Sequence, residues 1–182
     1  MGNVILIGFM GSGKTTVGLK LSYRLRRTMV DTDKEIERKE KRAISDIFAT
    51  DGEAYFRQRE TECLQRLIDT AGNQIISVGG GLPLREENRA LLRKLGQIFY
   101  LRAQAETIYE RLKDDTSRPL LNVDDPKTRI QALLQEREPY YRKAADTVVD
   151  VDGKGFEQIV SEIEARMERQ RGKGERNENT CH

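Results

Sequence analysis

Residues 8–15 constrain the fold of this chain more than any other stretch of its sequence. They read Gly-Phe-Met-Gly-Ser-Gly-Lys-Thr and fit the phosphate-binding pattern G-x-x-x-x-G-K-[ST], the P-loop, at every fixed position. An apolar run over residues 4–7 precedes them, and Val17, Leu21 and Leu25 follow at helical spacing. The pattern predicts a buried parallel strand, a phosphate loop and a helix in succession. The alternative, a glycine-rich turn that ends in Lys-Thr by chance, does not explain the strand and helix on either side.

The residue types of this loop suit a nucleoside triphosphate. Gly8, Gly11 and Gly13 let successive backbone N–H groups turn inward on an anion, and the helix that follows presents its N-terminus to it. Lys14 supplies a cation for the β- and γ-phosphates, and the hydroxyl of Thr15 is placed to ligate Mg²⁺. The predicted nucleotide-binding residues of the loop are Gly11, Ser12, Gly13, Lys14, Thr15 and Thr16.

Length and hydropathy predict one globular domain. The 182 residues are enough for one well-buried domain, which we expect over residues 1–170, with a disordered polar tail over residues 171–182. No apolar stretch approaches the roughly 18 residues of a membrane span, and the N-terminus does not resemble a signal peptide. We therefore expect a cytoplasmic protein with no membrane partner.

Cysteine, histidine and charge narrow the possible chemistry. Cys63 and Cys181 do not have metal-ligand spacing, and the one histidine, His182, is the last residue. A zinc site and a histidine general base are thus poorly supported, so a proton acceptor must be a carboxylate, a phosphate oxygen or water. The formal net charge of +2 comes from residues 166–179, and the rest of the chain is balanced, which argues against nucleic acid as a partner.

Apolar runs alternate with helical patterns along the chain, which is typical of a three-layer α/β sandwich with a five-stranded parallel sheet. The charged run over residues 34–42 indicates a solvated helix face without a function. The expected strands are residues 4–7, 29–31, 74–78, 97–101 and 147–151. The expected helices are residues 14–27, 34–41, 53–70, 86–94, 105–113, 127–138 and 156–167.

Two of the expected strands end in residues that suit a ligand site. Asp31 and Asp33 follow the second strand, and Gly79–Gly81 follow the third. Ligands bind at the carboxyl ends of the strands in an open parallel sheet, so both segments are predicted to face the phosphate site. The glycines would let the backbone approach a ligand closely, although one of them can serve only the next helix. The alternative is that one of the two aspartates, Asp33 included, only caps the helix that follows.

Residues 114–125 are too polar and too interrupted by proline to form core. We interpret the segment from about residue 113 to residue 125 as a mobile lid that excludes water from the reaction, with an ordinary surface loop as the alternative. A lid favours a small-molecule kinase over the other P-loop classes. The chain has no Asn-Lys-x-Asp for guanine, and its later strands do not end in the Asp-Glu of motor proteins.

Together these segments resemble the shikimate kinases in order and spacing, over residue 1 to about residue 165. The resemblance implies ATP-dependent phosphorylation of the 3-hydroxyl of shikimate, a step toward chorismate and the aromatic amino acids. It also implies a sheet of order 2-3-1-4-5 in a P-loop kinase fold, and we expect a monomer. The matching segments are residues 8–15, 31–33, 56–60, 79–81, 118–121 and 137–141.

The resemblance also implies an acceptor site, within a segment of about residues 32–62 and beyond it. Arg57 and Arg137 would hold the shikimate carboxylate through charge-assisted hydrogen bonds. Asp33 would accept from the ring hydroxyls and either orient or deprotonate the attacking one. Backbone groups of Gly79, Gly80 and Gly81 would contact the substrate, and Arg59 and Glu60 are weaker candidates as partners of this site.

On the nucleotide side, the resemblance places Mg²⁺ on Thr15 and Asp31. Lys14 and Arg118 would offset charge on the phosphoryl group as it is transferred. Arg111 would stack on adenine, and the alternative is a plain arginine on a helix surface. The predicted catalytic residues are Lys14, Asp33 and Arg118.

Two rival functions remain at this point. A gluconate kinase has a similar size and loop, but would not be expected to combine Asp33, Arg57, the triple glycine and Arg137 in this order. A regulatory nucleotide-binding module that has lost turnover would lack the acceptor-site residues. The sequence departs from the family pattern at Met29-Val30, where an aromatic residue is common, and this affects packing more than chemistry.

Overall fold

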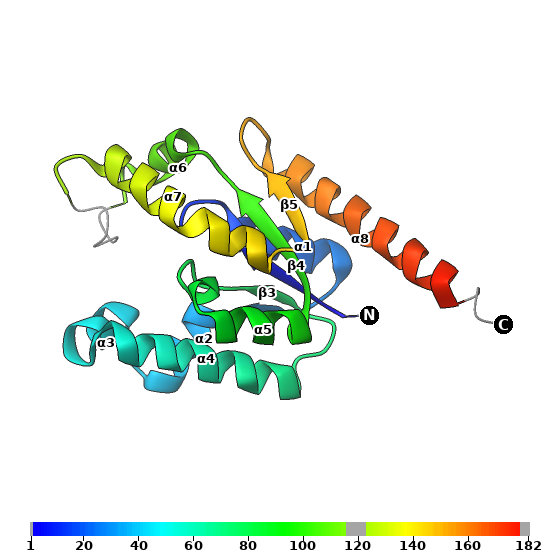
Figure 1. The fold of residues 1–182 in the computed structure, drawn as a ribbon, viewed down its shortest axis with the longest axis horizontal. Coiled ribbons are helices and arrows are strands. Elements are labelled where there is room, and N and C mark those ends of the chain that lie inside the picture. Colours follow the sequence, from blue (N-terminus) through cyan, green and yellow to red (C-terminus); the bar gives the residue numbers. More distant parts are fainter. Residues whose placement is uncertain (1, 116–122, 179–182) are drawn as a thin grey trace.

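A five-stranded parallel sheet forms the centre of the protein in a computed structural model, which describes residues 2–115 and 123–178 (Figure 1). The order is β2-β3-β1-β4-β5, and each neighbouring pair is parallel, which confirms the predicted fold class. The strands are β1 (Asn3–Ile7), β2 (Met29–Asp31), β3 (Ile75–Ser77), β4 (Gly96–Arg102) and β5 (Thr147–Asp150).

Helices connect the strands and cover both faces of the sheet. Helices α1 and α8 contact one face, whereas α5 and α7 contact the other, and α2 to α4 lie beside β2 and α5 (Figure 1). The described helices are α1 (Lys14–Leu25), α2 (Thr32–Glu40), α3 (Ile44–Thr50), α4 (Gly52–Thr70), the 3₁₀ turn η1 (Leu82–Leu84), α5 (Glu86–Leu95), α6 (Ala105–Leu112), α7 (Pro126–Ala144) and α8 (Phe156–Glu178).

Strand β1 runs through the middle of the core. Its residues Val4 to Ile7 are at most 1% exposed, as expected for a strand that is covered on both faces. Ile5 lies opposite Ile76 of β3 and Ile98 of β4. After β1 the chain forms β2 and β3 on one side of this strand, and after β3 it crosses to form β4 and β5 on the other side. The strand order therefore changes direction at β1, which leaves a crevice at the carboxyl ends of the strands.

Helix α7 continues past its predicted end. The sequence predicts an end near residue 138, before Pro139, and this is wrong because the helix continues through Pro139 to Ala144. Proline removes one backbone hydrogen bond from a helix interior. Tyr141 and Ala144 are both buried, and their packing keeps the last turns helical.

Helix α8 also runs farther than predicted. It extends to Glu178, into the segment that the sequence predicts to be a disordered tail from residue 171. Ile159, Ile163 and Met167 bury one side of its first turns, and its later residues include many good helix formers. Residues 179–182 lie outside the described residues.

Among the described helices, none combines the length and the apolarity needed to cross a bilayer. Cys63 is a free, buried thiol on α4, as its position on an apolar stripe predicts.

Candidate active site

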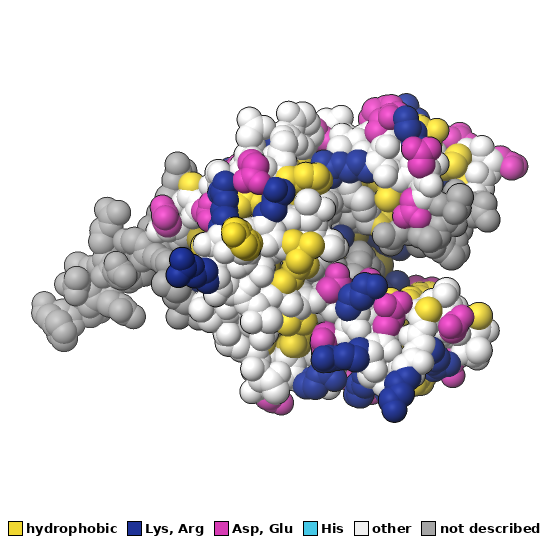
Figure 2. Space-filling view, turned by 180° about the vertical axis from the view of Figure 1, so that it is seen from behind, with side chains coloured by type: hydrophobic (Ala, Val, Ile, Leu, Met, Phe, Trp, Pro, Cys, Tyr) yellow, Lys and Arg dark blue, Asp and Glu magenta, His cyan; other side chains and the backbone are white. Residues whose placement is uncertain are grey.

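The surface is hollowed between two lobes at the carboxyl ends of the strands. Figure 2 shows this hollow between a lower lobe, which contains α2, α3 and α4, and an upper lobe that contains α6 and α7. Charged side chains of both signs crowd the lower lobe. The phosphate loop, the triple glycine and the first turn of α2 all lie at this end of the sheet, because each follows the carboxyl end of a strand.

The phosphate loop has the backbone that its glycines predict. Gly11 has φ 77° and Gly13 has φ 99°, a region that residues with a Cβ avoid. Gly13 is the N-cap of α1 and has no side chain to cover the first turn of the helix. The N-terminus of α1 is thus open to an anion at the mouth of the loop.

The side chain of Lys14 runs back along the loop that precedes it. Its Nζ donates to the carbonyl oxygens of Gly8 at 2.8 Å and Phe9 at 3.0 Å. Thr15 is exposed, and Thr16 is half-buried in the first turn of α1. The ammonium group and the Thr15 hydroxyl are therefore at the phosphate end of the helix.

Asp31, not Asp33, caps helix α2. Oδ1 of Asp31 accepts from the backbone N–H of Asp33 at 3.0 Å and of Lys34 at 3.2 Å. Asp33 is half-buried in the first turn, where the helix dipole favours a negative charge. The capping alternative for Asp33 is therefore wrong, and its carboxylate approaches the triple glycine.

Asp31 and Thr15 lie at the same end of the molecule. A Cβ built on Gly18 of α1 would be 2.8 Å from Cε of Met29 on β2, so strand and helix touch there. From that contact, Asp31 is two residues, about 6.6 Å, farther along the strand. Helix α1 runs in the opposite direction, so Thr15 is about 4.5 Å nearer the same end. A hydroxyl and a carboxylate are oxygen ligands of the kind that Mg²⁺ prefers, and Mg²⁺ needs few from the protein. These two residues therefore fit the metal.

The triple glycine is required by the side chains that press against it. A Cβ on Gly79 would lie 2.6 Å from Oδ1 of Asp33 and 3.1 Å from Oε1 of Glu60. On Gly81, a Cβ would lie 2.3 Å from Nη2 of Arg57. Neither glycine has a left-handed backbone, so close approach is what excludes a side chain here.

Arg57 and Glu60 form a buried ion pair on α4. Nη1 of Arg57 lies 2.7 Å from Oε2 of Glu60, whose side chain is 1% exposed. Burial raises the pKa of Glu60 to about 7, against the lowering effect of Arg57, and the nearby charge of Asp33 raises it further. The site thus contains a carboxyl group that changes charge near neutral pH.

Arg137 reaches the same region from α7. It is buried, and its guanidinium carbon lies 5.5 Å from the centre of the Phe9 ring in the phosphate loop. One turn later, Tyr141 donates from Oη to the carbonyl oxygen of Gly80 at 2.6 Å. A Cβ on Gly80 would lie 3.5 Å from the backbone nitrogen of Met10, so the triple glycine borders the phosphate loop directly.

Arg111 lies against the phosphate loop. Its Nη1 donates to the carbonyl oxygen of Gly11 at 3.0 Å, and its guanidinium carbon lies 5.4 Å from the ring centre of Phe156 on α8. The predicted lid is described only at its two ends, residues 113–115 and 123–125, and Arg118 lies outside the described residues. Asp125 closes the far end by capping α7 through the N–H of Thr128.

A buried network of hydrogen bonds holds the turn that directly follows the triple glycine. Asn88 of α5 donates to the carbonyl oxygen of Leu82 at 3.0 Å and accepts from the hydroxyl of Thr61 at 2.7 Å. Asn88 is fully buried and Thr61 is 7% exposed. The network links the loop to the helix that carries Arg57.

Several residues of this site have weak signals or none in the sequence. Tyr141 has no signal beyond its place in the matching segment 137–141, and Phe156 has none beyond its place at the start of an expected helix. Their contacts reach Gly80 and Arg111, which are far away in the chain. The Arg57–Glu60 pair has a local signal, because residues three apart share a helix face.

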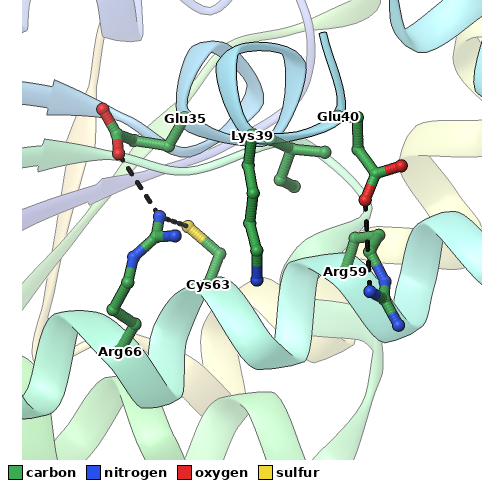
Figure 3. Close-up of a pocket in the computed structure, with 7 residues that line it drawn as sticks. Glu35, Lys39, Glu40, Arg59, Cys63 and Arg66 are labelled. Carbon is green, nitrogen blue, oxygen red and sulfur yellow. Dashed lines mark hydrogen bonds and ion pairs between the residues drawn. The ribbon is translucent and has the colours of Figure 1, made fainter. Parts of the chain in front are cut away.

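A small cavity between α2 and α4 lies on the outer side of the same helices (Figure 3). Its volume is about 10 Å³, room for one water at most. Arg66 contacts Glu35 at 3.3 Å and the Cys63 sulfur at 3.9 Å, and Arg59 lies 4.0 Å from Glu40. Burial raises the pKa of the Cys63 thiol to about 11, so the thiol stays protonated. This cavity is a charged seam between two helices and is too small for a substrate.

Comparison with known proteins identifies the family to which the chain is similar. A family model described as shikimate kinase matches residues 10–168. A shikimate kinase of Symbiobacterium thermophilum is 43% identical over 176 residues, which cover 96% of this chain and 99% of the relative. A second, from Thermodesulfovibrio yellowstonii, is 46% identical over 169 residues, covering 93% and 96% of the two chains.

A solved structure shares the fold closely. The shikimate kinase of Acinetobacter baumannii, determined in complex with shikimate, superposes with a TM-score of 0.88 at 35% sequence identity. The match covers 93% of this chain and 94% of the other.

Proposed function

Because the chain belongs to the shikimate kinase family, we propose that it transfers the γ-phosphoryl group of ATP to the 3-hydroxyl of shikimate with Mg²⁺ as the metal. Its activity is that of a shikimate kinase, an ATP-dependent enzyme of aromatic amino-acid biosynthesis. We further propose a role for each residue of the site.

One observation carries these roles. Asp33, Arg57 and Glu60 press against the triple glycine, and Gly80 borders the phosphate loop. Cations for a carboxylate and acceptors for hydroxyls are thereby gathered beside the place where a triphosphate would bind. The similarity to the enzyme solved with shikimate supports the same location for the acceptor.

On the acceptor side, Arg57 and Arg137 bind the carboxylate of shikimate. A guanidinium can form two parallel charge-assisted hydrogen bonds with a carboxylate, which fixes the ring as well as binding it. Asp33 accepts a hydrogen bond from the attacking hydroxyl. Phosphoryl transfer has a loose transition state, so the orientation of this hydroxyl contributes as much as its deprotonation.

On the nucleotide side, the phosphates lie on the N–H groups of the loop and on the N-terminus of α1. Lys14 leaves the carbonyl groups of Gly8 and Phe9 to contact the phosphates, and Arg118 adds a second cation. Thr15 and Asp31 would hold Mg²⁺. When bound, Mg²⁺ offsets the charge of the phosphate oxygens.

Arg111 binds the adenine ring in this proposal. It lies between the carbonyl oxygen of Gly11 and the ring of Phe156, so a flat guanidinium and an aromatic ring stand together at the outer side of the loop. Both groups stack on planar bases. Adenine would contact them where the ribose and phosphates lead outward from the loop.

A coupled assay tests the function. Release of ADP from Mg-ATP should rise when shikimate is added, and should stay at background with gluconate or a nucleoside monophosphate. Phosphorus NMR of the product should then show one phosphate ester on the 3-hydroxyl. Stimulation by gluconate would indicate a gluconate kinase. No stimulation by any acceptor would indicate a regulatory nucleotide-binding module that has lost turnover.

We also propose that the enzyme works as a monomer in the cytoplasm, since every acceptor-site residue named above comes from one chain. Light scattering during gel filtration should give the mass of a single chain. A dimer whose activity falls on dilution would contradict the proposal.

A further inference from the structure

Tyr141 lies where three parts of the site meet. It is fully buried on α7, one turn after Arg137. Its Oη donates to the carbonyl oxygen of Gly80 at 2.6 Å, and the positive charge of Arg137 lies near enough to act on the pKa of the same hydroxyl. A hydroxyl has one proton and two lone pairs, so donating to the carbonyl leaves the lone pairs for the guanidinium. One hydroxyl can therefore serve both groups.

The ring of Tyr141 is fixed with respect to the phosphate loop. It packs on Tyr100 of β4 with ring centres 5.1 Å apart, and both side chains are at most 1% exposed. Tyr100 lies opposite Ile7, the last residue of β1 before the loop. Closely packed interiors do not let a ring shift freely. The hydroxyl therefore has a set position relative to the loop that holds ATP.

The two groups beside the Tyr141 hydroxyl come from distant parts of the chain. Gly80 is the middle glycine of three and has no side chain to anchor it. Arg137 is on a helix that lacks one backbone N–H at Pro139, between Arg137 and Tyr141. The hydroxyl of Tyr141 thus lies between two parts of the proposed acceptor site.

We propose that Tyr141 is a positioning residue for acceptor binding, whose hydroxyl sets the spacing between the Gly80 carbonyl and the Arg137 guanidinium. The inference rests on the proposed function, in which Arg137 binds the carboxylate of shikimate. Tyr141 does not touch the substrate in this scheme. It acts through the two groups that do.

The role is positional because the hydroxyl keeps its proton. Burial raises the pKa of Tyr141 to about 12, although the positive charges of Arg137 and Arg57 act in the opposite direction. The hydroxyl stays a donor to Gly80 throughout the working pH range. Its contribution should therefore be the same at about pH 6.5 and about pH 8.5.

Tyr141→Phe removes the hydroxyl and keeps the ring. We expect the KM for shikimate to rise about three- to tenfold, the equivalent of one net hydrogen bond, with the KM for ATP changed less than about twofold. Tyr100→Phe is the matched control, since it removes the same atom from the other ring of the pair, and it should leave both KM values unchanged. A lower melting temperature for Tyr141→Phe with an unchanged KM for shikimate would mean that Tyr141 only stabilises the fold, and it would overturn the inference.

A double-mutant cycle separates this inference from the proposed function. Arg137→Ala should raise the KM for shikimate strongly, and adding Tyr141→Phe should then cost less than it does alone. If Arg137→Ala raises the KM and Tyr141→Phe does not, only the inference fails. An equal effect of Tyr141→Phe in both backgrounds means that Tyr141 acts without Arg137, which also overturns it. If Arg137→Ala leaves the KM unchanged, the proposed carboxylate site fails, and the inference falls with it.

Discussion

The two faces of helix α4 carry similar charges in different surroundings. On the inner face, Arg57 pairs with Glu60 at 2.7 Å, with side chains 14% and 1% exposed. On the outer face, Arg66 reaches Glu35 at 3.3 Å, with side chains 39% and 21% exposed. The inner pair lies against the triple glycine, whereas the outer pair borders a cavity of about 10 Å³.

The difference shows that burial, not charge, separates the residues proposed to bind the acceptor from the surface residues of this lobe. Arg57 and Arg59 are two positions apart, so they point to opposite sides of the helix. A buried charge keeps its field because little water screens it, whereas an exposed pair contributes little to stability. The predictions below test that distinction.

The largest effect should come from Asp33 on the inner side. Asp33→Asn should lower kcat by about 10²- to 10⁴-fold, because the amide cannot accept a proton and carries no charge. The affinity for ATP, measured by calorimetry, should stay nearly intact. Asp69→Asn, an exposed aspartate on α4, is the control and should be neutral. Equal losses in kcat and in ATP affinity would refute the role assigned to Asp33.

Arg57 and Arg59 give the sharpest direct comparison. Arg57→Ala should raise the KM for shikimate about 100-fold and cost about 3 kcal/mol of unfolding free energy, since it removes a substrate ligand and leaves Glu60 buried without its partner. Arg59→Ala should leave the KM unchanged. Steady-state kinetics and urea unfolding measure both. Similar KM values for the two variants would mean that the inner face is not the carboxylate site.

Local patterns predict most of the fold and the outline of the site. The phosphate loop, the aspartates after β2 and the glycines after β3 each follow from short motifs at strand ends, and the sheet then brings them together. The resemblance adds Arg57 and Arg137. These features depend on few residues each, so the sequence specifies them clearly.

What the sequence leaves out depends on packing between distant segments. The hydroxyl of Tyr141 meets a carbonyl group 61 positions away, and α7 crosses Pro139 because Tyr141 and Ala144 are buried. Neither fact has a local signature. The sequence also does not show which of Asp31 and Asp33 caps α2, because an aspartate at either position suits an N-cap.

Glu60 should make the stability depend on pH. Its pKa is about 7 in the folded protein against an ordinary 4.5, so the folded state binds more protons than the unfolded state between these values. The contribution of Glu60 to stability is then fully present below about pH 4.5 and is lost as the pH rises through about 7, by on the order of 3 kcal/mol. Glu60→Gln should remove most of this fall in urea unfolding between about pH 5 and about pH 8. Glu62→Gln, on the outer face, should keep it, and a fall that persists in Glu60→Gln would assign the titration to another group.

The smallest effect should come from Arg66 on the outer face of α4. Arg66→Gln removes the contacts with Glu35 and with the Cys63 sulfur, yet both charged groups are partly exposed and Glu35 keeps Arg38 at 2.6 Å. We expect a loss of at most about 0.5 kcal/mol, shrinking further in high salt, with kcat and both KM values unchanged. Urea unfolding at low and high salt, together with steady-state kinetics, measures this. A change in the KM for shikimate would show that the outer charges couple to the acceptor site through α4, and burial would then no longer separate the two faces.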